Sequence, residues 1–447
     1  MPTVTVVEWG TISPQVNQEG LGTINERVVS QEDFAYLYGI ASNVNQNPRP
    51  FSVINSSLIR VENLVGVLET PSGTVIEILP KTLDDEDDPV RARRLLCRLA
   101  MESVRTNPLQ IDEASLALAH LPFQEWVGKR FIDEVMRLLH RGLRAGYNEI
   151  ESQERFLQGR MLLSKQLKQG PAKAHLFEIA YEIFSLNRPE NRLIKTALLS
   201  VARKTQWAET KRLANLAQEI LDEIPYSTNI HADFSRWQNT RLTADYQDVR
   251  PWCTLILNEQ MPFATFGEWR GMSILFPMEK LFEEAVGRRL KYAVQPGIRV
   301  EEQHQDQYLC QQNGKPLFGL RPDFMIRGRT QNWIADAKWK KISDFISNGS
   351  RFNSPYGLSQ NDFYQLFAYG QKYLNGQGLM FLIYPKTKSF TKPLPIFEFN
   401  ERLKLAVIPV DLEAPFVRAF DGLQVFLSDD NNLSDSMNHP FRSQSSF

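Results

Sequence analysis

The sequence predicts a multidomain α+β protein, in which a β-rich and helical N-terminal region precedes a C-terminal domain with an αβββαβ core. Its 447 residues, 42% of them hydrophobic, suffice to bury two or three cores. Short β-rich segments dominate the beginning of the chain, and helical periodicity dominates the middle. A helix, a hairpin and a second helix follow one another towards the C-terminus.

Charge and cysteine content restrict the class of protein. The 51 basic and 52 acidic residues nearly cancel, so any contact with nucleic acid has to rest on local patches. Cys97, Cys253 and Cys310 lie far apart without CxxC spacing, which argues against a disulfide framework and a structural zinc site. The sequence shows neither a signal peptide nor an apolar run that approaches a membrane span. We therefore expect a cytoplasmic protein.

Residues 1–105 are expected to form a β-rich domain. The predicted strands are Val4–Trp9, Leu58–Glu69 and Thr74–Leu79. An acidic run over residues 84–88 precedes Pro89, and arginines follow it. Because the helix dipole favours acids at the start of a helix, this distribution predicts a helix over residues 89–104.

Residues 106–265 are expected to be mostly helical. Apolar residues spaced three and four apart predict helices over 122–144, 188–204 and 208–222. Turn-forming and polar residues then accumulate, and we place the boundary of the C-terminal domain, residues 266–427, near 265. Residues 428–447 are rich in Ser, Asn and Asp, which predicts a disordered tail.

The segment Leu320–Lys340 predicts two strands joined by a turn near Gly328. In the second strand, residues 333, 335, 337 and 339 fall on one face, which we interpret as core, and residues 336, 338 and 340 fall on a charged face. A symmetric hairpin places Asp323 directly opposite Asp336, with Cβ atoms roughly 5 Å apart.

Asp323 and Asp336 are candidate ligands of one cation. Two like charges this close are destabilising unless a cation or proton lies between them, and oxygen ligands favour Mg²⁺ or Mn²⁺. Lys338 points into the same site, where an ammonium would orient the attacking water and offset charge on a phosphoryl group. The set predicts phosphodiester hydrolysis. Asp-Ala-Lys alone is a weak string that usually marks surface ion pairs, so its context decides.

The context is the order α-β-β-β-α-β. It consists of a helix over 276–292, a strand over 298–301, the hairpin, a helix over 361–374 and a strand over 379–384. On the second helix, Gln365 and Tyr369 share a face, with Asp362 three residues earlier, and we place Gln365 and Tyr369 in the catalytic site. The alternative for Tyr369 is a packed core aromatic. Glu283 on the first helix is a candidate third metal ligand, and Glu279 is a weaker one.

Four segments together resemble the McrC family, the nuclease subunit of McrBC restriction systems, which belongs to the PD-(D/E)xK superfamily. They are Arg321-Pro322-Asp323, Asp336-Ala337-Lys338-Trp339-Lys340, Leu281-Phe282-Glu283 and Tyr364-Gln365-Leu366-Phe367-Ala368-Tyr369-Gly370. Shorter similarities, such as Gly66-Val67-Leu68, Leu157-Gln158-Gly159-Arg160 and Asn191-Arg192, extend into the N-terminal half. The resemblance implies that Asp323 and Asp336 bind metal and that Lys338 is the catalytic lysine.

The resemblance also implies a partner. McrC works with McrB, an AAA+ GTPase ring that recognises and moves DNA, and the N-terminal part of McrC, here residues 1 to about 265, docks on the ring and stimulates hydrolysis. The expected substrate is double-stranded DNA, methylated DNA included. No G-x-x-x-x-G-K-[ST] motif occurs, so we expect this chain to bind no nucleotide. Basic residues expected near the site are Arg327, Arg329, Lys340, Lys341, Lys386 and Lys388.

Two alternatives remain open. Gln365-x-x-x-Tyr369 also resembles RecB-type nucleases, which predicts a nuclease acting alone or with a helicase, although the large N-terminal half has no helicase motifs. The other alternative is a non-catalytic activator of an AAA+ ring. Such an activator has no need of two facing carboxylates and a lysine. The six scattered histidines favour neither a zinc deaminase nor a histidine-based nuclease.

Overall fold

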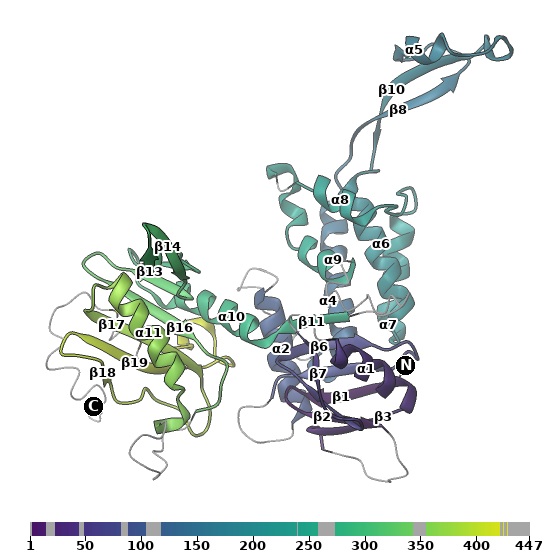
Figure 1. The fold of residues 1–447 in the computed structure, drawn as a ribbon. Coiled ribbons are helices and arrows are strands. Elements are labelled where there is room, and N and C mark those ends of the chain that lie inside the picture. The colour runs from purple at the N-terminus through teal and green to yellow at the C-terminus, as the bar shows by residue number, and fades with distance from the viewer. Residues whose placement is uncertain are drawn as a thin grey trace, which may run out of the picture. The chain divides into compact units, whose positions relative to one another are not determined.

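The computed structural model describes residues 2–14, 23–43, 49–81, 88–103, 118–238, 240–257, 273–342 and 355–420, together with 423 and 427. It divides into two compact units, each described here by itself. Unit 1 comprises Met1–Leu79 and Val104–Leu275, and unit 2 comprises Pro80–Ser103 and Phe276–Phe447. Both contain helices and sheets, which confirms the α+β class (Figure 1). The predicted boundary near 265 and the predicted tail lie outside the described residues.

Two four-stranded sheets form the N-terminal part of unit 1. The first has the order β1-β7-β6-β11, with strands Thr3–Val7, Val75–Leu79, Leu64–Glu69 and Ser273–Pro277. The second has the order β3-β2-β5-β4, with strands Glu26–Val29, Thr11–Pro14, Leu58–Val61 and Phe51–Asn55, and helix α1 (Gln31–Ser42) packs on it. The prediction of one strand over Leu58–Glu69 was wrong, because β5 and β6 belong to different sheets. Helix α1 was not predicted.

A helical bundle makes up the middle of unit 1. It contains α4 (Phe123–Arg141), α6 (Pro189–Lys204), α7 (Ala208–Ile220), α8 (Ile230–Arg236) and α9 (Arg250–Leu257), and the three predicted helices are confirmed within three residues. Glu77, fully buried in β7, joins the sheet to the bundle: its carboxylate accepts hydrogen bonds from Thr5 Oγ1 and from the Phe123 amide, each at 2.8 Å. A carboxylate at a helix N-terminus is stabilised by the helix dipole.

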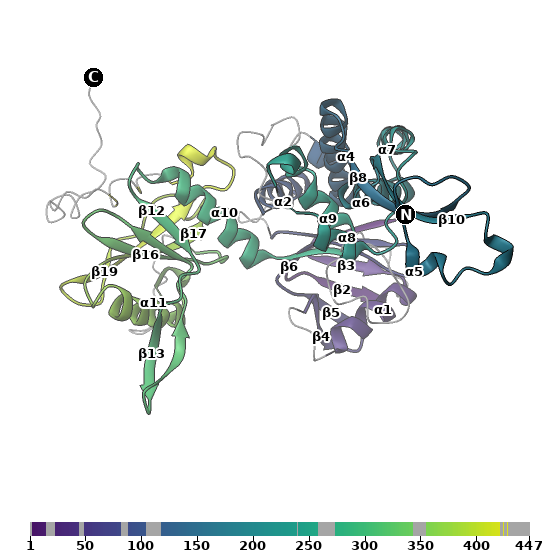
Figure 2. The same cartoon turned by 90° about the horizontal axis from the view of Figure 1, so that it is seen from above.

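A two-stranded arm projects from this bundle (Figures 1 and 2). Strands β8 (Gly146–Glu154) and β10 (Phe177–Ser185) pair antiparallel along their whole length, and the tip carries β9 (Arg160–Met161) and the short helix α5 (Leu163–Gln166). The prediction of a mostly helical middle region missed this arm. The signal was the alternation of apolar residues along β10, which has the period of a strand.

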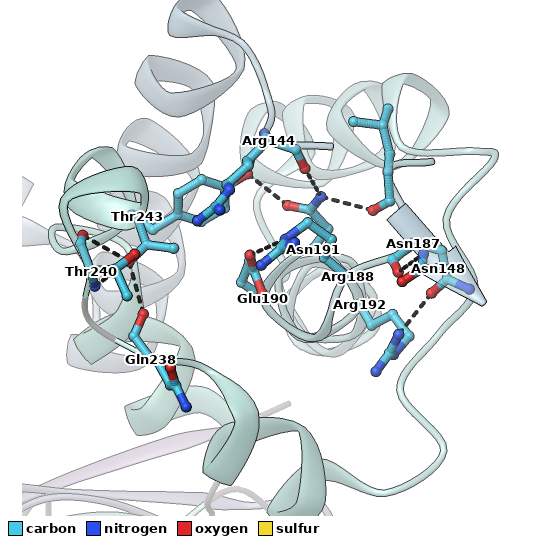
Figure 3. A network of polar contacts seen from close by, with 12 residues as sticks. Arg144, Asn148, Asn187, Arg188, Glu190, Asn191, Arg192, Gln238, Thr240 and Thr243 are labelled. Carbon is cyan, nitrogen blue, oxygen red and sulfur yellow. Dashed lines mark hydrogen bonds and ion pairs between the residues drawn. The ribbon is translucent and has the colours of Figure 1, made fainter. Parts of the chain in front are cut away.

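Asn191, at the start of α6, fastens the base of the arm (Figure 3). This fully buried amide donates to the carbonyl of Arg144 at 3.1 Å, before β8, and to that of Leu186 at 2.8 Å, after β10. Its oxygen accepts from the Tyr246 hydroxyl at 2.8 Å. Asn148 adds a bond to the carbonyl of Asn187 at 2.8 Å. The entry and the exit of the arm are therefore tied to one side chain.

Unit 2 is built on a six-stranded mixed sheet with the order β12-β15-β16-β17-β19-β18. The strands are Arg299–Glu302, Phe324–Arg327, Asn332–Ala337, Gly378–Pro385, Leu403–Val410 and Phe397–Glu398. Helices α10 (Met278–Ala293) and α11 (Gln360–Tyr373) precede β12 and β17. The order α10-β12-β15-β16-α11-β17 is the predicted one. The predicted start of α10 at residue 276 was wrong, because Phe276 belongs to β11.

Two features of unit 2 correct the expectations. The face of β16 that carries Asp336 is not only charged, because Ile334 on that face is buried against Leu366 and Tyr369 of α11. Helix α2 (Pro89–Ser103) belongs to unit 2 and not with residues 1–79, because it packs along α10. There Glu102 and Arg289 form an ion pair with no exposed side-chain surface, so separating them would leave a buried charge uncompensated.

A second hairpin, β13 (Gln307–Gln312) and β14 (Lys315–Leu320), is inserted between β12 and β15. Its two-residue turn is Asn313-Gly314, with φ angles of 51° and 75°. Asn-Gly is the sequence most typical of such a turn, and the sequence analysis passed over it. No helix in the described part of the chain is both long and apolar enough to cross a membrane.

We predict that Asn191→Ala lowers the free energy of unfolding by about 2 kcal/mol, because two partly buried carbonyls lose their donor and the buried Tyr246 hydroxyl loses its acceptor. Limited proteolysis should then cut the arm faster, and thermal unfolding should show the lost stability. Asn215→Ala, at an exposed position of α7, is the matched control and should change neither. An Asn191→Ala protein as stable and as protease-resistant as the unchanged chain would contradict the role of this amide.

Candidate active site

The pairing of β15 with β16 brings two aspartates together. Phe324 pairs with Ala335 and Arg327 with Asn332, so the register continues to Asp323 opposite Asp336, as predicted. The amide of Ala337 donates to Asp323 Oδ2 at 2.9 Å and fixes that carboxylate against the neighbouring strand. Asp336 is only 1% exposed, because β16 lies between β15 and β17 in the sheet.

Lys338 follows directly after β16. Its backbone amide donates to the carbonyl of Ile383 at 2.9 Å, which extends the parallel pairing with β17, and its ammonium lies 2.6 Å from Asp336 Oδ2. Burial lowers the pKa of Lys338, but the nearby carboxylates, Asp336 above all, outweigh burial and raise that pKa above its ordinary value. The nearby carboxylates therefore favour the charged ammonium form of Lys338.

The two aspartates are held in an environment that resists their charge. Burial, together with the charge of Asp323, raises the pKa of Asp336 to about 7. Burial, together with the charge of Glu283, raises the pKa of Asp323 to about 6. Apart from the close approach of Lys338, neither carboxylate oxygen of Asp336 has a hydrogen-bond partner among the described residues. A buried carboxylate in this state requires a proton or a cation.

Glu283 lies beside this pair but is separated from it by Gln303. The side-chain amide of Gln303 donates to Glu283 Oε1 and lies 3.5 Å from Asp323 Oδ1, and its backbone amide donates to the Asp323 carbonyl at 2.9 Å. Gln303 has a φ of 54°, a strained conformation for this residue type. Among the described residues, no three His, Cys, Asp or Glu side chains form a group that could hold a metal ion. Glu279, one turn earlier, is exposed.

Helix α11 places Gln365 and Tyr369 next to the aspartates. Gln365 Nε2 donates to the Tyr369 hydroxyl at 2.7 Å, and that hydroxyl donates to the carbonyl of Arg321 at 3.0 Å. Tyr369 is 4% exposed and part of the hydrophobic core, so the packed aromatic of the alternative interpretation is present. Its hydroxyl also fixes the backbone two residues before Asp323.

Gln303 was missed by the sequence analysis, since no pattern marks a lone glutamine after a strand.

A further carboxylate borders the site. Asp362, in the first turn of α11, accepts a hydrogen bond from the buried Tyr384 hydroxyl at 3.0 Å. Its charge adds to the causes that raise the pKa of Asp336, after burial and the larger effect of Asp323. The sequence placed Asp362 on the same helix as Gln365. The buried tyrosine that holds Asp362 comes from β17 and was not predicted.

The expected basic residues are only partly at this site. Arg327 pairs with Glu301 at 2.8 Å and lies at the turn end of the hairpin, roughly 13 Å along the strand from Asp323. Arg329 lies beyond Arg327, in the turn itself, so the expectation was wrong for both arginines. The lysines follow β16 or β17 at the end where Asp336 lies, and Lys386 is paired with Asp411 at 3.1 Å.

Comparison with known proteins identifies the family of this chain. Residues 59–385 match the family described as McrBC 5-methylcytosine restriction system component. This chain belongs to the McrBC family. The resemblance to its McrC members is thereby confirmed. No curated protein matches the sequence of this McrBC family member.

Two solved structures are similar to this McrBC family member. One is a chain of the refined half-complex from the tetradecameric assembly of Thermococcus gammatolerans McrB AAA+ hexamers with bound McrC. It has a TM-score of 0.64 at 17% identity and covers 93% of this chain and 99% of that one, which shows a common fold. The other is a chain of the cryo-EM structure of the Thermococcus gammatolerans McrBC complex, with a TM-score of 0.46 at 18% identity, covering 64% and 88%.

We predict that metal-free protein loses stability as pH rises from about 4 to about 7. Folding raises the pKa of Asp323 and Asp336 above the ordinary value of 3.8, so in this window the folded state binds more protons than the unfolded state. Asp336→Asn removes the charge and should be more stable than the unchanged chain at pH 8, with the difference shrinking towards pH 5.

Urea unfolding in the presence of a chelator measures this difference. Glu279→Gln makes the same carboxyl-to-amide change at an exposed position of α10 and should leave the pH profile unchanged. Parallel profiles for Asp336→Asn and the unchanged chain would show that Asp336 is not a destabilising charge.

Proposed function

We propose that this chain is the metal-dependent DNA endonuclease subunit of a McrBC-like restriction system, and that unit 2 is a PD-(D/E)xK nuclease domain. The observation that carries the proposal is the buried pair Asp323 and Asp336 with Lys338 beside it. Two facing buried carboxylates with one lysine beside them cost stability, and catalysis of phosphodiester hydrolysis by a bound cation gives a reason for keeping them.

The side chains fit a hard divalent cation. The carboxylates of Asp336 and Asp323 would hold Mg²⁺ or Mn²⁺, and Glu283 would be reached directly or through water once the side-chain amide of Gln303 moves away from it. When bound, such an ion acts as a Lewis acid on a phosphoryl oxygen and lowers the pKa of water. The ammonium of Lys338 offsets charge that develops on the phosphoryl oxygens. Gln303 and Tyr369 position the carboxylates.

The alternatives fit the structure less well. A non-catalytic activator of an AAA+ ring gains nothing from two facing buried carboxylates beside a lysine. A RecB-like nuclease that acts alone leaves the helical bundle and arm of unit 1 without a purpose. Similarity of fold to a chain from McrB AAA+ hexamers with bound McrC supports a partner. We therefore propose that an AAA+ GTPase ring binds unit 1 and delivers double-stranded DNA, methylated DNA included.

The arm of unit 1 is the proposed contact with this partner. Large apolar side chains along it are exposed to water, which is unusual unless another protein covers them. They are Tyr147, Phe156, Leu157, Leu163, Leu167 and Phe184, and Leu167 is 85% exposed.

We predict that the chain with its partner, GTP and Mg²⁺ cleaves long duplex DNA, and that Asp336→Asn or Lys338→Ala lowers the cleavage rate at least about 100-fold. Asp323→Asn should act similarly by weakening metal binding. Glu279→Gln is the control and should retain activity. Because the chain is nearly neutral, the same assay without partner should be much slower at physiological salt. Full Mg²⁺-dependent cleavage by Asp336→Asn would remove the site assignment.

We predict that Leu167→Glu weakens the affinity for the partner at least about tenfold and reduces stimulation of its GTP hydrolysis, without loss of folding. Leu216→Glu, on an exposed part of α7, is the matched control. The full chain is used because a fragment that ends near 265 lacks β11, which completes the first sheet. Unchanged stimulation by Leu167→Glu would place the contact elsewhere.

A further inference from the structure

The ribbon formed by β13 and β14 leaves the sheet of unit 2 beside the candidate active site. The chain departs after Gln303, whose amide contacts Glu283, and returns at Arg321, two residues before Asp323. Both views show the ribbon projecting from the sheet (Figures 1 and 2). Every residue from Leu309 to Gly319 is exposed, so this ribbon covers no core of its own. A projecting element with two exposed faces needs a reason outside unit 2.

Helix α11 holds both feet of the ribbon. The hydroxyl of Tyr373 lies 3.3 Å from the carbonyl of His304 and 2.8 Å from that of Leu320, one on each strand's side. Tyr369 bonds the carbonyl of Arg321 at 3.0 Å. These contacts fix the direction of the ribbon relative to Asp323, because the same helix packs on the strands that carry the aspartates. Whatever the ribbon binds is therefore placed at a set distance from the site.

The chemistry of the ribbon suits a polyanion. Residues 307–320 contain no Asp or Glu, and Lys315 stands next to the turn. The arm of unit 1 has a different composition: its two long strands carry Glu149, Glu151, Glu154, Glu178 and Glu182. Carboxylates repel phosphates, so the absence of Asp and Glu from the ribbon makes it compatible with DNA.

The shape and surface of the ribbon suit a groove of the duplex. A two-stranded β ribbon has the width that the major groove admits. Cys310 pairs with Leu317 and Tyr308 with Gly319, and Leu309 and Phe318 lie between these two pairs. Leu309 is 46% exposed and Phe318 72%, so both would leave water on binding. The amide side chains near the turn, Gln311, Gln312 and Asn313, are of the kind that bonds to base edges.

We propose that the β13–β14 ribbon enters a groove of double-stranded DNA next to the bond that is cleaved and holds the duplex at the aspartates. The inference rests on the proposed nuclease function and adds the surface that positions the substrate. DNA is favoured over a second copy of this chain, because a polyanion explains the absence of carboxylates as well as the position beside the site.

Cys310 tests the proposal in the unaltered full-length chain. It is the exposed one of the three cysteines, while Cys97 and Cys253 are buried, so a maleimide reports on the ribbon alone. With Ca²⁺ in place of Mg²⁺ to prevent cleavage, saturating duplex DNA should slow the reaction of Cys310 at least about tenfold. In the control chain, Cys310→Ser with Leu216→Cys, the reporter lies on an exposed part of α7 in unit 1, and DNA should not protect it.

Binding affinities supply a second test. Leu309→Glu should weaken duplex binding, measured by fluorescence anisotropy at low salt, at least about tenfold, and Leu216→Glu on α7 should leave it unchanged. Lys315→Glu should lower the salt dependence of binding by about one phosphate contact. If the unaltered chain binds and cleaves DNA while Cys310 stays unprotected and Leu309→Glu binds normally, the ribbon is not the contact.

Two further outcomes separate this inference from the proposed function. Failure of the unaltered chain, supplied with its partner, to bind or cleave DNA at all would overturn the nuclease assignment and the ribbon proposal with it. Protection of Cys310 that follows protein concentration and needs no DNA would assign the ribbon to a contact between copies and overturn the DNA proposal alone.

Discussion

The opposition of Asp323 and Asp336 across two paired strands is the constraint on which the arrangement of unit 2 depends. Backbone pairing of β15 with β16 sets this opposition, and the strand β17 on the other side of β16 keeps Asp336 out of water. The free energy of the fold thus supports two charges that repel each other in a medium of low dielectric. Such a cost persists in a protein only where the surrounding packing over-determines it.

The residues around Asp323 and Asp336 have different roles at the site. The ammonium of Lys338 compensates the charge of Asp336. The neutral side-chain amide of Gln303 donates to Glu283 and holds it near the two aspartates. Helix α11 links the site to the ribbon, since Tyr369 and Tyr373 bond to carbonyls at its feet. Under the proposed function, the same helix would link metal binding at the aspartates to positioning of DNA by the ribbon.

Local sequence patterns predicted the pairing of the two aspartates better than they predicted the residues and elements around them. Strand alternation and turn position were enough to pair Asp323 with Asp336, because register in a short hairpin is a local property. The role of Gln303 could not be predicted, because it depends on a backbone with positive φ and on a contact with Glu283, twenty residues earlier on α10. Helix α2 packs in unit 2, where Glu102 forms a buried ion pair with Arg289 of α10. These residues are 187 positions apart, and local periodicity does not predict so distant a contact. The arm was missed because helices surround it in sequence.

Proton release on metal binding tests the central claim most directly. If the two aspartates share a proton near neutral pH and exchange it for a cation, calorimetric titration with Mn²⁺ at pH 6.5, in buffers of different ionisation enthalpy, should show release of about one proton per ion. The release should fall towards zero at pH 8.5 and should be lost in Asp336→Asn. Binding of Mn²⁺ without proton release at pH 6.5, or equal binding by Asp336→Asn, would contradict the account.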